Sequence, residues 1–239
     1  MVQVQADDRI IVALDVNTLD SMQAMVGRLG DSVSYYKVGM ELFYSVGTGA
    51  VDMLRAKNKK VFLDLKFHDI PNTVAASVYT LTRMGVSLLS LHAAGGHSVL
   101  QAAANAAQEA SHRYGVERPR LVAITALTSF DDKEWEEIGG ELPISRHVVK
   151  LAKVAQRAGI DGVVASPQEA GLIREACGPD FLIVTPGIRP ASAAVNDQRR
   201  IATPRDALQA GANRLVIGRP ITAAPDPVQA VAAILQEQP

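Results

Sequence analysis

The sequence predicts a single (β/α)8 barrel, a fold of the α/β class, on three observations. Short runs rich in Val, Ile and Leu alternate with longer helical patterns, roughly every 30 residues, as in parallel βαβ units. The chain has 239 residues, near the roughly 250 that one such barrel needs. Hydrophobic residues make up 48% and aromatic residues only 5%, which suits an aliphatic parallel sheet covered by helices. We therefore expect one domain over residues 1–239.

Eight runs have the composition of buried strands, and that number favours a closed barrel over an open doubly wound sheet. They are, in chain order, Ile10–Asp15, Tyr35–Gly39, Val61–Lys66, Leu88–His92, Leu121–Ala126, Gly162–Ala165, Leu182–Thr185 and Arg214–Ile217. Helical patterns follow them near residues 19–30, 46–58, 70–84, 97–113, 145–158, 167–177, 203–210 and 226–237.

Several of these helices carry their own start and stop signals. Ser166 and Thr203 each precede a proline, which puts a capping side chain just before a proline in the first turn. Gly85, Gly159 and Gly211 follow helical patterns, where glycine commonly ends a helix. These signals indicate helices between the strands rather than long loops.

One segment departs from the alternation. Residues 129–140 follow the fifth predicted strand and contain Trp135 among acidic side chains, with two glycines at the end. We interpret the segment as a solvated helical turn anchored by the tryptophan. The alternative is that it forms part of an active-site rim, because loops after barrel strands line that face.

Charge and cysteine content narrow the class of protein. The net charge of -1 and the pI near 6.5 give no reason to expect a nucleic-acid partner or an acidic membrane surface. The single cysteine, Cys177, cannot form an intrachain disulfide, and we expect it to be a small buried hydrophobe. The sequence has no signal-peptide pattern and no apolar run of about 18 residues, so we expect a cytoplasmic protein.

Charged residues gather where the predicted strands end. Asp64 and Lys66 share one face of an otherwise apolar strand, and Asp69 follows just past its end. The first strand ends at Asp15, and the second carries Lys37. Because barrel chemistry gathers at the carboxyl ends of strands, and buried charges need partners, we expect one charged site at this mouth.

Each of these residues has a structural alternative. Asp15 could cap the following turn, Asp69 could cap the helix that starts near Pro71, and both lysines could pair at the rim. We expect His92 to be a hydrogen-bonded rim residue and the other histidines we considered, at 97, 112 and 147, to be surface residues. Lysines interleaved with the acids would repel a cation, so an ion-pair array is favoured over a metal site.

A separate signal points to a phosphate. Gly218 and Arg219 end the last strand, where a backbone amide and a guanidinium can meet an anion. Barrels often bind phosphate after strands seven and eight, and the seventh loop supplies Arg189. The small-residue stretch that continues to Arg199 either folds over a ligand or is a mobile surface loop.

The motif Asp-Leu-Lys-Phe-His-Asp-Ile-Pro-Asn-Thr at residues 64–73 resembles the signature of the orotidine 5'-phosphate decarboxylase family. The resemblance extends along the chain through Ala-Leu-Asp at 13–15, Lys-Val-Gly at 37–39, Leu-Thr-Ser at 127–129, Thr-Pro-Gly-Ile-Arg at 185–189 and Ile-Gly-Arg-Pro at 217–220. It implies a homodimeric barrel with a shared active site. That enzyme converts orotidine 5'-monophosphate to UMP and CO2, the last step of de novo UMP synthesis, without metal or organic cofactor.

The resemblance also implies the role of each site residue. Lys37, Asp64 and Lys66 would form a charge network with Asp69 of the partner subunit, and Lys66 would donate the proton. Asp15 and Lys37 would hold the ribose hydroxyls, with Thr73 of the partner subunit nearby. The remaining expected contacts are Thr128 to the pyrimidine, and Arg189, Gln198, Gly218 and Arg219 to the phosphate, with Gln198 bridging toward the base. Closure of the loop from Arg189 to Arg199 over the phosphate is a further expectation.

Two other functions fit part of this pattern. A related barrel enzyme such as 3-keto-L-gulonate 6-phosphate decarboxylase also has an Asp-x-Lys-x-x-Asp pattern but needs Mg²⁺. The continuation Phe-His-Asp-Ile-Pro-Asn-Thr at 67–73 argues against it. A catalytically silent nucleotide-binding barrel is the alternative from another class, and the intact set of lysines and aspartates argues against that function.

Overall fold

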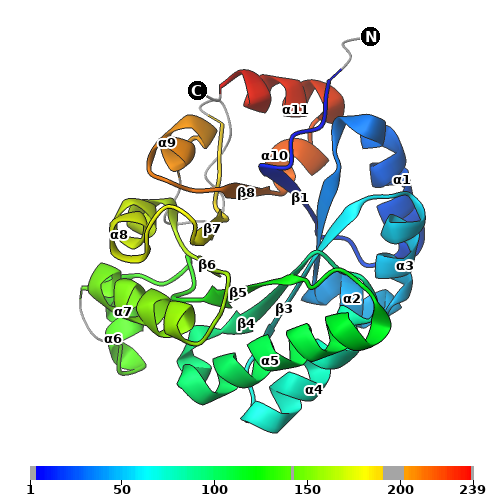
Figure 1. Ribbon diagram of the computed structural model, residues 1–239. Helices are drawn as coiled ribbons and strands as arrows, with labels where there is room; N and C mark the ends of the chain where they lie inside the picture. The colour runs from blue at the N-terminus through cyan, green and yellow to red at the C-terminus, as the bar shows by residue number, and fades with distance from the viewer. Residues whose placement is uncertain (1–3, 141–142, 191–201, 238–239) are drawn as a thin grey trace.

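The computed structural model describes residues 4–140, 143–190 and 202–237. In these residues eight parallel strands close into a barrel, each paired with the next and β8 with β1, which confirms the predicted (β/α)8 fold. Figure 1 shows the helices outside the barrel. The strands are β1 Ile10–Leu14, β2 Tyr35–Gly39, β3 Lys60–Phe67, β4 Leu88–His92, β5 Arg120–Ile124, β6 Gly162–Val164, β7 Leu182–Thr185 and β8 Arg214–Ile217.

The helices follow the strands around the ring. They are α1 Leu19–Leu29, α2 Met40–Val46, α3 Gly49–Ala56, α4 Pro71–Thr82, α5 Gly96–Tyr114, α6 Asp132–Glu137, α7 Ile144–Arg157, α8 Pro167–Cys177, α9 Pro204–Gln209, α10 Arg219–Thr222 and α11 Pro227–Gln236, with short 3₁₀ helices η1 Gly30–Ser32 and η2 Ala93–Gly95. Among the described residues, none of these helices is long and apolar enough to cross a membrane.

Strand positions agree with the sequence prediction more closely than helix positions do. The bounds of β2, β4, β7 and β8 match the prediction residue for residue, and the other strands differ by one or two residues at one or both ends. The single helix expected near 46–58 is wrong, because two helices, α2 and α3, occupy residues 40–56. Gly47 separates them with a φ of 63°, a conformation that ends the first helix. The short α10 was not predicted.

The predicted caps are confirmed. Ser166 accepts a hydrogen bond from the amide of Gln168 at the start of α8, and Thr203 accepts one from Asp206 at the start of α9. The three glycines expected after helices have positive φ, at 68°, 80° and 105° for Gly85, Gly159 and Gly211. Local sequence therefore sets where these helices begin and end.

The acidic segment after β5 forms a short capped helix, α6, which confirms our interpretation of residues 129–140. The Asp131 side chain and Glu134 form a capping box at its start. Trp135 is buried, with its ring 5.4 Å from that of Phe130 and 5.0 Å from that of His147. The tryptophan thus fixes an otherwise solvated turn to the barrel.

The core has two layers, as expected for a barrel whose strands alternate inward and outward side chains. One buried cluster fills the space between strands and helices, and a second lies inside the barrel. The inner cluster consists of Ile11, Ala13, Tyr35, Phe62, Leu88, Val122, Leu182, Val184 and Val216. Each large apolar side chain buried in this way contributes about 1.5–3 kcal/mol.

The inner cluster also positions the site. In the first four strands, the inward position that follows the apolar layer falls on a polar residue: Asp15, Lys37, Asp64 and Ser90. The apolar layer therefore forms a floor below these polar groups, at the carboxyl ends of the strands. Elsewhere, Cys177 is buried at the end of α8, and burial raises the pKa of its thiol, which fits the small buried hydrophobe we expected.

Candidate active site

The site is built around an ion pair at the end of β3. Asp64 is only 7% exposed, and its Oδ2 lies 2.8 Å from the Nζ of Lys66. The prediction that both side chains share a face is confirmed, but the backbone reaches this arrangement through an irregularity. The register between β3 and β4 shifts between Leu63 and Phe67, and Lys66 has a φ of 55°.

A second lysine extends the ion pair into a chain of alternating charges. The Nζ of Lys37, on β2, lies 3.2 Å from Oδ1 of Asp15 and 3.9 Å from Oδ2 of Asp64. From here on we call Asp15, Lys37, Asp64 and Lys66 the charge network; this set within one chain adds Asp15 to the expected residues and leaves out Asp69. Their side chains are 58%, 13%, 10% and 27% exposed, respectively, so the network is sheltered at its centre and open at Asp15. A pair so sheltered is screened less by salt than a surface ion pair.

Two glycines allow the backbone to approach this network closely. A Cβ on Gly39 would lie 2.9 Å from the Nζ of Lys37, so a larger residue would occupy the space of the ammonium group. A Cβ on Gly218 would lie 3.4 Å from Oδ2 of Asp15, which places the end of β8 beside the network. The expected phosphate-binding pair, Gly218 and Arg219, therefore begins next to the ribose-binding candidate Asp15.

Two histidines border the network. The rings of His68 and His92 are stacked, with their centroids 5.0 Å apart. Burial, together with the charges of His68 and Lys66, holds the pKa of His92 below its ordinary value of 6.5, against the opposite effect of Asp64. A hollow of about 340 Å³ lies beside both rings, bounded by Trp135 and other apolar side chains.

The structural alternative for Asp69, that it caps the helix starting near Pro71, is wrong, whereas for Asp15 the structure shows only that another residue caps α1. Thr18, not Asp15, caps α1, and its hydroxyl accepts from the amide of Ser21. Ile70 is the N-cap residue of α4. Asp69 precedes that cap, and its Oδ1 accepts the amide hydrogen of Ile70 at 2.6 Å.

Not every expected site residue joins the network within one chain. Asp69 and Thr73 are exposed, on the connection to α4 and in its first turn. Thr128 is half-buried in the connection after β5, Arg219 is the first residue of α10, and Arg189 is buried, with its Nη1 donating to the carbonyl of Ile188. Gln198, like most of the loop expected to close from Arg189 to Arg199, lies outside the described residues.

Two residues beside the network were not predicted from the sequence. Ser90, on β4, donates its hydroxyl hydrogen to Oδ1 of Asp64 at 2.7 Å. Its signal was a hydroxyl residue at an inward position within the run Leu-Leu-Ser-Leu. Gly39 was quoted only as part of a motif, although its missing side chain leaves room for Lys37.

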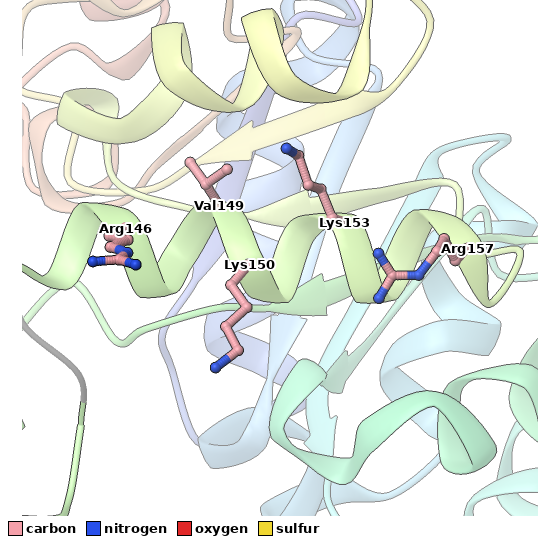
Figure 2. A pocket seen from close by; sticks show the side chains of 5 residues that line it. All are labelled: Arg146, Val149, Lys150, Lys153 and Arg157. Atoms are coloured by element: carbon pink, nitrogen blue, oxygen red, sulfur yellow. The ribbon is translucent and has the colours of Figure 1, made fainter.

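One hollow on the surface lies away from this chemistry. A hollow of about 370 Å³ runs along α7, and Figure 2 shows its lining side chains. They are Arg146, Val149, Lys150, Lys153 and Arg157, all from that one helix. A basic face on an outer helix is ordinarily a solvated surface, and none of these residues is at the end of a strand.

A larger and more apolar hollow, of about 620 Å³, lies over α2 and α4. Phe43, Tyr44 and Phe67 contribute to its lining, together with Thr73. Tyr44 is 73% exposed, and Ile70, which precedes Thr73 by three residues, is 65% exposed. An exposed apolar area of this kind is typical of an interaction surface.

The donor set does not suggest a metal centre. Within residues 4–140, 143–190 and 202–237, no group of three or more His, Cys, Asp or Glu side chains is placed to hold a metal ion. In the charge network, the ammonium group of Lys37 lies between the carboxylates of Asp15 and Asp64.

Comparison with known proteins gives a consistent result. The sequence profile described as "Orotidine 5'-phosphate decarboxylase / HUMPS family" matches residues 8–234. An orotidine 5'-phosphate decarboxylase from Moorella thermoacetica is 51% identical over 238 residues, covering 99% of this chain and 94% of the relative. One from Pelobacter propionicus is 50% identical over 233 residues, covering 98% and 96%. The crystal structure of orotidine 5'-phosphate decarboxylase from Lactobacillus acidophilus superimposes with a TM-score of 0.85 at 40% identity, covering 97% and 99%.

Proposed function

The chain belongs to the orotidine 5'-phosphate decarboxylase / HUMPS family. We therefore propose that its charge network catalyses the loss of CO2 from orotidine 5'-monophosphate, which leaves UMP. The observation that carries the proposal is the sheltered ion pair of Lys66 with Asp64, 2.8 Å apart at the mouth of the barrel. The chain is thus a carboxy-lyase of pyrimidine nucleotide synthesis.

Lys66 has the central role in this proposal. When the bond from C6 to the carboxylate breaks, CO2 leaves and an electron pair stays on C6, where no conjugated carbonyl can absorb it. An ammonium group beside C6 stabilises this charge and then transfers its proton to the carbon. Asp64, beside the substrate carboxylate, repels it, and Lys37 and Asp69 of the partner subunit keep the network charged and oriented.

No single ion pair of the network is strong enough to account for catalysis. Enzymes lower barriers by roughly 8–23 kcal/mol, whereas one ion pair at an effective dielectric near 20 supplies about 4 kcal/mol at 4 Å. The remainder comes from placement of the substrate and from binding energy at its distant groups. We assign the ribose hydroxyls to Asp15 and Lys37, with Thr73 of the partner subunit, and the pyrimidine to Thr128. The phosphate is assigned to Arg189, Gln198, Gly218 and Arg219.

A second copy of the chain is part of the proposal. The apolar hollow over α2 and α4 gives a second copy a surface to bury, and Asp69 is exposed rather than held within its own chain's network. Burying such a surface against an identical one gives a two-fold dimer. Asp69 and Thr73 of each subunit then complete the site of the other. Because Cys177 cannot form an intrachain disulfide, we also propose the reducing cytoplasm as the compartment.

Replacing Lys66 with alanine tests the reaction. CO2 release should be lost while UMP still binds, since the phosphate and ribose contacts are made by other residues. Loss of the orotidylate absorbance measures turnover, and calorimetry measures UMP binding. Lys133→Ala is the matched control, because that lysine is 85% exposed and pairs only loosely with Glu137. Near-normal turnover by Lys66→Ala would refute the assigned role.

Two further experiments separate the alternatives. Turnover in the presence of a chelator should be unchanged; its loss would favour the Mg²⁺-dependent relatives. Mixed subunits carrying Asp69→Ala and Lys66→Ala should regain part of the activity through hybrid dimers, each with one complete site. If subunits are shown to exchange and no activity returns, the site is not shared.

A further inference from the structure

Ser90 occupies an inward position on β4, beside Asp64 of the charge network. Its side chain is fully buried. Ser90 lies between Leu89 and Leu91 in the sequence, and it shares the inward face of β4 with Leu88 of the inner cluster, two residues earlier. A buried hydroxyl without hydrogen-bond partners is costly, so a serine here needs a reason.

Both hydrogen-bonding capacities of this hydroxyl are used, and both partners lie on β3. Oγ donates to Oδ1 of Asp64 at 2.7 Å and accepts from the backbone amide of Lys66 at 3.0 Å. The direction is fixed by chemistry, because an amide can only donate, so the single hydroxyl hydrogen goes to the carboxylate. One serine thus contacts the carboxylate and the backbone of its lysine partner at once.

The amide of Lys66 needs this acceptor because the strand is irregular there. Leu63 pairs with Leu89 and Phe67 pairs with Leu91, so four residues of β3 advance against two of β4. Residues in such a bulge lose their regular ladder bonds. Lys66 has a φ of 55°, a conformation that residues with a Cβ rarely adopt. The bond to Ser90 gives the amide a partner in that conformation.

The carboxylate of Asp64 is oriented by the same contact. Its Oδ1 is taken by Ser90, and its Oδ2 lies 2.8 Å from Nζ of Lys66 and 3.9 Å from Nζ of Lys37. Both ammonium groups therefore meet the same oxygen. Without the hydroxyl, neither lysine contact requires Oδ2 rather than Oδ1, because the two carboxylate oxygens are equivalent. The carboxylate can then turn about its Cβ–Cγ bond.

We propose that Ser90 is a positioning residue, which turns Asp64 so that one oxygen meets both lysines and holds the backbone that aims Lys66. Ser90 acts through these two residues rather than on the substrate. This inference rests on the proposed function for its kinetic consequence, but the geometry can be tested without substrate.

Threonine and valine at position 90 give the sharpest comparison, because they share a shape and differ only in the hydroxyl. Ser90→Thr should keep kcat within about threefold of the unaltered enzyme. Ser90→Val should lower kcat roughly 10- to 100-fold relative to Ser90→Thr, the range expected for a lost hydrogen bond to a charged group. KM and the affinity for UMP should change less than about threefold, since the binding contacts are elsewhere.

A control separates positioning from stability. Ser32 is also buried, and its hydroxyl donates to the carbonyl of Leu29, away from the site. Ser32→Ala should lower the melting temperature and leave kcat unchanged. If Ser90→Val matches Ser90→Thr in kcat, or if the loss falls on KM alone, the positioning role is overturned.

Hydrogen exchange at the Lys66 amide is the test that needs no substrate. This amide should exchange at least about tenfold faster in Ser90→Val than in Ser90→Thr, because its acceptor is gone. Equal rates would overturn the inference. If the unaltered chain fails to decarboxylate orotidine 5'-monophosphate, the proposed function fails, while the exchange comparison still decides whether Ser90 holds Lys66.

Discussion

Replacing Gly39 with alanine is expected to displace the ammonium group of Lys37 without straining the backbone. Gly39 has a φ of −91°, which any residue adopts. The new Cβ would lie 2.9 Å from Nζ of Lys37, and the end of a lysine side chain moves easily. Because ordinary contacts between heavy atoms begin near 3.5–4.0 Å, the ammonium group must retreat by roughly 0.5–1 Å.

The cost of this displacement can be worked out from the network. At an effective dielectric of about 20, the attraction between Lys37 and Asp64 at 3.9 Å is about 4.3 kcal/mol. If the ammonium group moves away from Asp64, the attraction falls to about 3.4–3.8 kcal/mol. The difference of about 0.5–0.9 kcal/mol corresponds to roughly a two- to fivefold loss of kcat/KM, at tenfold for each 1.36 kcal/mol.

Steady-state decarboxylation of orotidine 5'-monophosphate measures this loss, and urea unfolding measures the free energy of unfolding, which should change by less than about 1 kcal/mol. Gly27 on α1 is the matched control, since its Cβ would meet nothing within 4 Å. Gly27→Ala should leave kcat/KM unchanged and stabilise the helix by up to about 1 kcal/mol. An unchanged kcat/KM in Gly39→Ala would refute the view that the position of Lys37 matters to the reaction.

Arg219→Ala should weaken UMP binding roughly 10- to 100-fold, as expected for a lost hydrogen bond to a charged group, and should weaken uridine binding less than about twofold. If calorimetry shows equal losses of affinity for UMP and uridine, Arg219 does not bind the phosphate. His92 has a pKa below 6.5, so the fold disfavours its protonated form, and stability present above pH 6.5 is lost as the pH falls toward the lower, folded-state pKa. Urea unfolding at pH 7.5 and 5.5 measures this loss, and the free energy of unfolding should fall less between the two pH values in His92→Gln than in the unaltered protein. An equal fall in both proteins would contradict the prediction. Gly162→Ala should destabilise by about 1–3 kcal/mol or more, because its Cβ would lie 2.1 Å from the carbonyl oxygen of Leu182; an unchanged urea midpoint would show that β6 and β7 separate freely.

Much of the fold could be predicted because the strands of a parallel barrel are buried on both faces and can be recognised as short apolar runs. The bounds of the buried runs of β2, β4, β7 and β8 were predicted from their composition and confirmed. The helix α2 was missed because it follows β2 directly, beginning at Met40 without a capping side-chain bond. Because the last residue of the strand, Gly39, is also the N-cap of this helix, no capping side chain marks the start of the helix in the sequence.

The site could be predicted as a set of charges but not as a geometry. Two-residue spacing indicated that Asp64 and Lys66 share a face, and they do. The bulge that brings them within 2.8 Å depends on how β3 pairs with β4, which is a relation between distant segments. Ser90 and Gly39 were missed for a related reason. Ser90 matters through its bond to Asp64 on the neighbouring strand, and Gly39 matters because the Nζ of Lys37 lies close to its Cα.

With the role proposed for Lys66, the backbone conformation at residue 66 lowers thermal stability at a position where turnover needs a lysine. Among the described residues, only Asn58 and Lys66 carry a side chain at positive φ, and asparagine tolerates that conformation far better than lysine does. A glycine at position 66 would adopt this backbone freely, whereas a residue with a Cβ carries a penalty of roughly 1–2 kcal/mol there. If Lys66 is the proton donor we propose, variant libraries ranked by melting temperature alone will favour residues that lack its amine, and an engineering programme that aims for a heat-resistant catalyst has to keep residue 66 fixed.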